Sequence, residues 1–469
     1  IGLYKFDILS QRGLGHIKET VEIVAANQDK QIDITQVQTF KQDPVLNANL
    51  VKGNTIGCFY IESPAMRSLL NKLLCDNYLT LVAASSIIRP GVAQSGMMDE
   101  YIRRHRFPEE RTRIHPVMGD IMPDTYGVMV YQEDVIKVAH YFAKLTLSEA
   151  DVLRRGMSGK SRSKDEFQRI KTKYFENCIQ LGYDKALAAD VWHQIESFAG
   201  YSFAKGHSAS YAVESYQSLH LKSYYPLEFM VAVINNFGGY YSTELYFHEA
   251  RKNGAHIEAP CINNSTYNTR ITGKTIYVGF VHLTGLETAL AEQLLAEREQ
   301  NGAYTSLDNF LDRIPIHLEQ LELLITINAF RFTGILKREL LIEAYTRMHK
   351  SKKSTPGNTL FEKAAPVKYT FPPLHSDPRS DAWDEIKILG FPLTSPFLLI
   401  DDPIMQNKIC VKAIDFPKYV GKTVEIVGYL ITTKRTSTKN GEPMYLGTFI
   451  DPDGNWVDTA HFPAVAKQY

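Results

Sequence analysis

The sequence predicts a mainly helical protein of several domains that ends in a small strand-rich part. Its 469 residues exceed one compact domain. Apolar residues recur at helical spacing from about 10 to 240, and short helices joined by glycine-bearing turns follow to about 350. From about 420 the apolar period changes to two. These three patterns predict helical domains first and strands last.

Composition excludes some functions and leaves others open. Lys and Arg together number 52, as do Asp and Glu, so the formal net charge is zero. This balance excludes a globally basic nucleic-acid binder but allows a local basic patch. The five cysteines are dispersed, which indicates reduced thiols in the cytoplasm rather than disulfides or a zinc site. No apolar run approaches the roughly 18 residues of a membrane span.

The chain opens on an apolar residue, Ile1, and on a strand-like segment from Gly2 to Leu9. A strand at the very start of a domain lacks an earlier partner to pair with. We therefore expect the sequence to be part of a larger protein. Within this strand, Lys5 and Asp7 lie two residues apart and project to the same side. That geometry suits a carboxylate holding Mg²⁺ beside a lysine that meets phosphate, although a solvated surface pair is the alternative.

Several helix starts and apolar faces are marked in the first half. Ser148 and Asp151 fit a capping box, with Leu147 and Val152 as its hydrophobic staple. Two further helices each carry an apolar face, formed by Phe167, Ile170, Tyr174 and Cys178 and by Leu187, Val191, Ile195 and Phe198. Ser208 is the expected N-cap of the next helix, and Pro226 opens one that runs from Leu227 to Asn235.

The second half shows turns and strands. Segment 275–280 resembles a strand, and tight turns lie at 283–286, around Gly285, and at 328–334. Such hairpins suit amide contacts to a sugar-phosphate backbone, or they are plain helical hairpins. A proline-punctuated linker covers 351–380. A strand at 423–431, a basic loop and two more strands predict part of an OB-type barrel. The loop cations are Lys434, Arg435 and Lys439.

Two basic segments are candidate phosphate sites. Residues 151–173 carry a local charge of +5, and Arg154 and Arg155 could hold a triphosphate bidentately, unless they belong to a solvated helix face. Lys205 and His207 lie beside the expected start of a helix, which is a natural anion site. Tyr201 and Tyr211 could stack on a base or sugar.

Three other polar features are not predicted to bind a metal. His248 and His256 lack the spacing of a zinc motif and are expected at the surface. The segment Asp451–Gly454 is expected to be a turn between strands rather than a metal loop.

Taken together, these segments resemble the C-family replicative DNA polymerases of bacteria, the catalytic alpha subunits of DNA polymerase III. The resemblance is collinear along essentially the whole chain. It rests on Lys5-Phe6-Asp7, Arg89-Pro90-Gly91, His115-Pro116, Thr125-Tyr126-Gly127, Tyr131-Gln132-Glu133, Leu153-Arg154-Arg155, Phe198 to Tyr201, Lys205, His207-Ser208-Ala209 and Tyr224 to Phe229.

The resemblance implies a domain order and roles for the candidate residues. The implied parts are the end of a palm strand (1–9), fingers (10–240), a clamp-binding helix-hairpin-helix domain (241–350), a linker with a clamp peptide (351–400) and a truncated OB fold (401–469). Asp7 would be the third of three palm aspartates that together bind two Mg²⁺ ions, with Lys5 near the substrate phosphates. Arg154, Arg155, Lys205 and His207 would bind the nucleotide. Gly285, Lys434, Arg435 and Lys439 would contact DNA.

The resemblance also implies partners: primer–template DNA, dNTPs, the sliding clamp, the clamp-loader tau subunit and a proofreading exonuclease. Leu360 and Phe361 match the anchors of the family's clamp peptide, whose leading Gln is absent here. The family's paired-aspartate motif is also absent from this sequence, so we expect the chain alone not to polymerise. A non-enzymatic DNA-binding scaffold remains the alternative function.

Overall fold

The computed structural model describes residues 12–89, 96–113, 115–157, 164–197, 204–351, 377–400, 410–438 and 441–468. Two compact units can be distinguished in it. The described residues of the first unit run as far as Lys18 and then from Ile32 to Tyr225, and those of the second are Glu19–Gln31 and the chain from Pro226 onward. Helix α1 (Arg12–Gln28) therefore contributes to both units.

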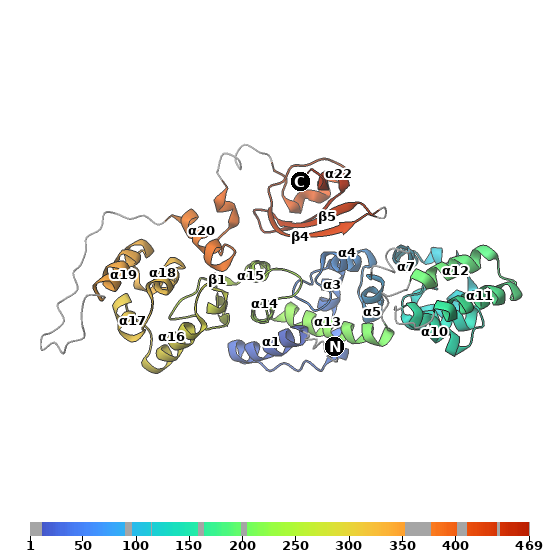
Figure 1. Cartoon of the computed structure of the whole chain (residues 1–469), viewed down its shortest axis with the longest axis horizontal. Helices are drawn as coiled ribbons and strands as arrows, with labels where there is room; N and C mark the ends of the chain where they lie inside the picture. The colour runs from blue at the N-terminus through green and yellow to red at the C-terminus, as the bar shows by residue number, and fades with distance from the viewer. Residues whose placement is uncertain are drawn as a thin grey trace. The chain divides into compact units, whose positions relative to one another are not determined.

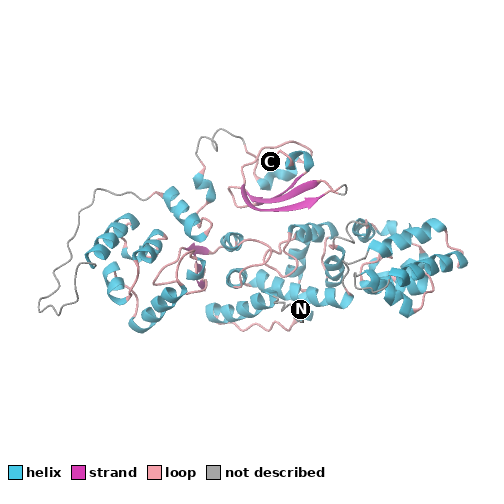
Figure 2. Ribbon diagram, viewed as in Figure 1, coloured by secondary structure: helices cyan, strands magenta, loops and turns pink. Residues whose placement is uncertain are grey.

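The first unit is helical and has no strand among its described residues (Figures 1 and 2). After α1 its elements are α2 (Val37–Gln42), α3 (Pro44–Lys52), α4 (Pro64–Leu73), α5 (Tyr78–Ile87), α7 (Met97–Arg106), η1 (Pro108–Arg113), α8 (Pro116–Ile121), η2 (Pro123–Thr125), α9 (Gln132–Lys137), η3 (Val138–Phe142), α10 (Leu147–Met157), α11 (Lys164–Gln180), α12 (Lys185–Ser197) and α13 (Lys205–Tyr224). The predicted helical first half is confirmed.

Local sequence explains these helices and their packing. Asp43, Ser63 and Asn77 cap α3, α4 and α5 with their side chains, as expected of N-cap residues. The long helix α13 packs against α2, α3 and α5. The predicted apolar face of α11 is confirmed at Ile170 and at Tyr174, both fully buried. Buried residues are found along the whole of α13, from Ser208 to Lys222, whereas α11 packs against α10 and α12.

The second unit combines helices with two small sheets (Figure 2). Its elements are α14 (Pro226–Asn235), α15 (Thr243–Lys252), β1 (His256–Glu258), β2 (Arg270–Thr272), β3 (Thr275–Tyr277), η4 (Phe280–His282), α16 (Thr288–Asn301), α17 (Leu307–Arg313), α18 (Leu318–Thr326), η5 (Arg331–Thr333), α19 (Lys337–Ser351), α20 (Pro378–Leu389), η6 (Pro396–Leu399), η7 (Ala413–Tyr419), β4 (Tyr429–Ser437), β5 (Pro443–Ile450), β6 (Trp456–His461) and α22 (Pro463–Ala466). Helix α14 starts at Pro226 as expected, whereas α20 lies where the sequence predicted only linker.

The first sheet has the order β1-β3-β2, with β1 parallel and β2 antiparallel to β3. Only β3 corresponds to the predicted strand at 275–280. Gly279 follows it and is required by close backbone approach, since a Cβ there would lie 2.5 Å from the Thr269 nitrogen and 2.6 Å from the Tyr267 oxygen. The chain is thereby folded tightly against itself just before the first hairpin.

The second sheet is antiparallel, in the order β4-β5-β6. The predicted strand at 423–431 is confirmed only from Tyr429 onward, and the prediction of a loop at Lys434 and Arg435 is wrong. β4 begins at Tyr429, and Lys434 and Arg435 lie within it, opposite Leu446 and Tyr445. Both cations are exposed on an edge strand, where charged side chains are favoured because one strand edge faces water.

The turn between β5 and β6 is confirmed at Asp451, whose carboxylate accepts the N–H of Asn455 (2.7 Å) and of Ala413 (3.0 Å). His256 is exposed as expected. His248 was also expected at the surface, but it is half-buried. Its Nε2 lies 3.1 Å from the carbonyl oxygen of Gly454. Burial lowers the pKa of His248, which favours the neutral ring in the packing of α15 against this turn.

Two general expectations are also addressed by the structure. All five cysteines are free thiols, and four of them are buried. No helix in the described part of the chain is long and apolar enough to cross a membrane.

Candidate functional site

Helix α10 carries the two arginines singled out in the sequence, and its start differs from the prediction. The capping box is formed by Thr146 and Glu149, not by Ser148 and Asp151: Glu149 Oε2 accepts the N–H of Thr146 (3.0 Å), and Thr146 Oγ1 accepts the N–H of Glu149 (3.3 Å). Lys173 of α11 also donates to Glu149 (2.8 Å). Leu147 is 61% exposed, so the predicted staple is wrong as well.

The true cap leaves Asp151 one turn inside α10, where it binds both arginines. Arg154 donates from Nε (2.9 Å) and Nη2 (2.8 Å) to Asp151 Oδ1, and Arg155 Nε lies 2.9 Å from Oδ2. Consecutive helical residues point about 100° apart. Because it accepts from both, Asp151 brings the two guanidinium groups to one face of the helix, where all three side chains are partly exposed.

The start of α13 also differs from the prediction. The helix begins at Lys205, and its N-cap, Ala204, makes no side-chain capping bond. Ser208 is therefore not the N-cap; it is buried within the helix, with its Oγ 2.6 Å from Ser86 Oγ of α5. The hydroxyl joins α13 to α5 instead of capping the helix.

Lys205 is held by residues from two other elements. Its N–H donates to Glu133 Oε2 of α9 (2.9 Å), and its Nζ pairs with Asp124 Oδ2 of η2 (3.1 Å). Nζ also lies 5.5 Å from the centre of the Tyr131 ring. A carboxylate thus occupies the helix N-terminus, the position that sequence analysis assigned to a phosphate.

An aromatic cluster follows along the same helix. The rings of His207 and Tyr211 are 4.6 Å apart, and Tyr60 meets Tyr211 edge-on at 5.0 Å. Arg89 lies over Tyr60, 5.6 Å from its ring centre. Tyr60 has φ +65°, which is uncommon for a bulky residue and marks strain that surrounding contacts maintain.

The structure links the two basic groups through α9. This helix packs against α10, and its first-turn Glu133 contacts Lys205. Sequence reasoning found the four cations but missed the carboxylates Glu133 and Asp124, and it missed Tyr60. No local spacing could reveal them, since Asp124 lies 81 residues before Lys205.

The first helical hairpin lies between η4 and α16, and its turn is confirmed by Gly285, with φ +91°. Gln320 of α18 supports it: Nε2 donates to the Gly285 carbonyl (2.8 Å), and Oε1 accepts the N–H of Glu287 (3.0 Å). The Thr284 N–H donates to the carbonyl of Ile388 in α20 (2.9 Å). The amides on both sides of Gly285 therefore bond within the protein.

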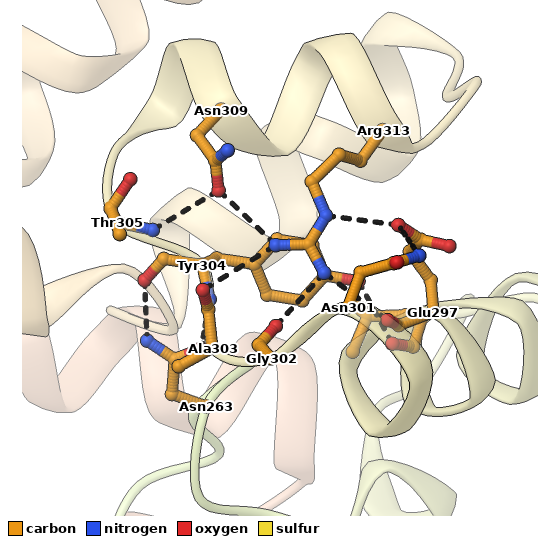
Figure 3. Close-up of polar contacts among 10 residues, drawn as sticks. Asn263, Glu297, Asn301, Gly302, Ala303, Tyr304, Thr305, Asn309 and Arg313 are labelled. Atoms are coloured by element: carbon orange, nitrogen blue, oxygen red, sulfur yellow. Dashed lines mark hydrogen bonds and ion pairs between the residues drawn. The ribbon is translucent and has the colours of Figure 1, made fainter.

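The end of α16 is fixed by the guanidinium of Arg313, which points into the loop after that helix (Figure 3). Arg313 donates to the carbonyl oxygens of Glu297 (3.1 Å) and Gly302 (2.8 Å) and to the Glu297 carboxylate (3.0 Å). It lies 4.3 Å from the Tyr304 ring centre. It thus satisfies helix-terminal carbonyls that otherwise lack partners. This network holds the hairpin module together and is structural.

Several predicted site residues lie outside the described residues, namely Lys5, Asp7, Tyr201, Leu360, Phe361 and Lys439. In the described ranges, no group of three or more His, Cys, Asp or Glu side chains could hold a metal ion. The described residues therefore do not fit a Mg²⁺ site.

Comparisons with known proteins match two parts of this chain to family models. A family model described as the bacterial DNA polymerase III alpha subunit finger domain matches residues 13–182, which include Arg154 and Arg155. A helix-hairpin-helix motif model matches 254–340, which includes Gly285. The chain is 30% identical to the DNA polymerase III subunit alpha of Treponema pallidum and 28% identical to that of Aquifex aeolicus, each over 100% of its length.

The chain belongs to the family of bacterial DNA polymerase III alpha subunits. The subunit alpha of Staphylococcus aureus strain COL is 33% identical over 73% of the chain. The chain spans 41% of the Treponema relative and 39% of the Aquifex relative. Within this family, α10 and its arginines fall in the fingers match, and the Arg313 network falls in the hairpin match.

Proposed function

We propose that the chain binds an incoming dNTP through Arg154, Arg155, Lys205 and His207, as the fingers of a DNA-directed DNA polymerase. One observation carries the proposal: Asp151 gathers two guanidinium groups on one face of a helix in the segment that matches the fingers. Paired arginines are suited to bidentate contacts with a triphosphate. Nη1 of Arg154 has no partner among the described residues and is available to a phosphate oxygen.

The proposed reaction is attack of a primer 3′-hydroxyl on the α-phosphate of the dNTP, with release of pyrophosphate. The divalent cation of this chemistry neutralises developing charge on the phosphates when it is bound. The part assigned to this chain is to bind and orient the triphosphate with cations. Positive charge fixed around the β- and γ-phosphates stabilises the leaving group.

A substitution in α10 tests the proposal. We expect Arg154→Ala in the 469-residue chain to weaken binding of a fluorescent dNTP about tenfold. The matched control is Arg169→Ala, which removes an exposed arginine from the same basic segment. Affinity for a short duplex DNA is measured alongside by fluorescence anisotropy and is expected to be unchanged.

The same measurement distinguishes the alternative function. A uniform loss of DNA affinity in Arg154→Ala, with a shallower salt dependence and unchanged dNTP affinity, would establish a DNA-binding scaffold in place of nucleotide-binding fingers.

We further propose that the helix-hairpin-helix module and the sheet carrying Lys434 and Arg435 contact primer–template DNA, and that Leu360 and Phe361 dock on the sliding clamp. Two adjacent apolar anchors can fill a pocket on a partner. Changing both anchors to Ala should reduce clamp affinity in surface plasmon resonance, and an unaltered affinity would contradict clamp docking. The tau subunit and a proofreading exonuclease are proposed partners from the family alone.

A further inference from the structure

Helix α20 contacts both helical hairpins of the second unit, the first at Gly285 and the second at the turn around Gly334 that precedes α19. Near its start, the carboxylates of Asp381 and Asp384 bind Nζ of Lys337, the first residue of α19. Near its end, the carbonyl oxygen of Ile388 accepts the N–H of Thr284 in the first hairpin (2.9 Å). One helix thus forms ion pairs with a cation of the second hairpin and accepts a hydrogen bond from an amide of the first. Cations and amides are the kinds of groups that contact a phosphate backbone.

A cavity marks the place where α20 faces the second hairpin. Its volume is about 220 Å³. On the hairpin side it is lined by Gly334, which has φ +70°, and by Lys337 and Arg338. On the α20 side it is lined by Asp377 and Asp381. The start of α19 is therefore open enough to admit a phosphate, while acidic side chains already stand beside it.

The cations at this hairpin differ in their partners. Arg331 is paired with Glu258 (2.8 Å), and Lys337 with two carboxylates. Burial lowers the pKa of Lys337, but the hydrogen bonds that its ammonium donates to Asp381 and Asp384 outweigh this effect, so the net pKa is raised. Lys337 therefore keeps its positive charge, and the two aspartates beside it balance that charge. Arg338, the next residue, is exposed and has no carboxylate partner among the described residues.

We propose that α20 is an internal competitor of DNA: its carboxylates take the place of backbone phosphates at Lys337, and duplex binding must displace them. The proposal rests on the proposed contact of the hairpin module with DNA. The helix lowers the affinity of the module for any duplex, since it neutralises a cation without regard to sequence. Such a contact delays tight binding until α20 moves.

A double-mutant cycle in the 469-residue chain tests this, with a short labelled duplex as probe. Asp381→Asn with Asp384→Asn keeps the shape of both side chains but removes their charge. Affinity should rise several-fold beyond that of the control Glu292→Gln with Glu299→Gln, which removes two exposed charges of α16. The slope of log affinity against log salt should steepen by about 1, for one added phosphate contact.

Lys337→Ala completes the cycle. We expect it to change the affinity of the original chain little, and to abolish the gain in the Asn variant. Hydrogen exchange in α20 should also accelerate when duplex is added to the original chain. Any of three results would overturn the competitor role. The Asn variant could gain no more duplex affinity than the control, Lys337→Ala could change duplex affinity equally in both backgrounds, or hydrogen exchange in α20 could stay unchanged on adding duplex. If neither the original chain nor any variant binds duplex, the DNA contact itself is wrong, and the competitor role fails with it.

Discussion

Glu214 is a carboxylic acid enclosed within the first unit. It lies on α13 and is 7% exposed, and its Oε1 has no hydrogen-bond partner among the described residues. A Cβ on Gly13 would collide with this oxygen and would lie 2.7 Å from the Phe59 ring. Burial raises the pKa of Glu214 to about 7. The neutral acid is therefore the form that the fold accommodates.

A raised folded-state pKa sets the direction of the pH dependence. Below an unfolded pKa near 4.5 both states hold the proton, and the contribution of Glu214 to stability is fully present. That contribution is lost as pH rises through about 7, because the folded state must then bury a charge. We expect Glu214→Gln to stabilise the first unit by about 1–3 kcal/mol at pH 8 relative to pH 5.

The measurement is the difference in unfolding free energy between variant and original chain at the two pH values. Glu176→Gln, on the exposed side of α11, is the matched control and should show no such difference. An equal effect of Glu214→Gln at both pH values would show that the carboxyl is not protonated in the fold.

At this scale the sequence identified the cations but not their partners. Arg154 and Arg155 could be predicted as an anion site from residue type and local charge. Asp151 was assigned to a cap because Ser148-x-x-Asp151 and Thr146-x-x-Glu149 both fit the same pattern. The second cap forms in the fold, where Lys173 also binds Glu149. With the cap at Thr146, Asp151 lies inside α10, where it binds the arginines.

At the scale of elements, Arg313 determines how α16 ends and α17 begins. We expect Arg313→Ala to lower the free energy of local opening around Gly302 by about 2–4 kcal/mol, because several carbonyl oxygens and the Glu297 carboxylate lose a charged donor. Hydrogen exchange of the amides from 294 to 313 measures this.

Two variants make the Arg313 test specific. Arg313→Lys keeps the charge but not the planar fork, so it should restore only part of the protection. Arg270→Ala removes an exposed arginine that donates to Thr272 (3.0 Å) and should leave exchange unchanged. Full protection in Arg313→Ala would contradict the role given to the network.

Long elements could be predicted from the sequence and short ones could not. The helical faces of α11 and α12 follow from apolar spacing, the start of α14 from Pro226, and the hairpin turns at Gly285 and Gly334 from glycine placement. β1 and β2 are three residues each, too short for a period of two to be visible. β4 was misplaced because Lys434 and Arg435 suggested a loop, whereas an edge strand tolerates them.

At the scale of the whole molecule, the chain forms two compact units, with Glu19–Gln31 grouped with the part that follows Tyr225. We expect denaturant unfolding followed by hydrogen exchange to show two cooperative transitions. Glu214→Gln should shift only the unfolding transition of the first unit, and Arg313→Ala should shift only that of the second. A joint shift by either variant would show that the units unfold as one.

The sequence by itself determined the helical character, the hairpin turns, the basic segments and the family resemblance, because periodicity, glycine placement and motif order are local properties. Only the tertiary structure decided which carboxylate each cation binds. Lys205 pairs with a residue 81 positions earlier, and Lys337 binds an aspartate 47 positions later. Ion pairs over such separations depend on how helices pack, which no local pattern in the sequence records.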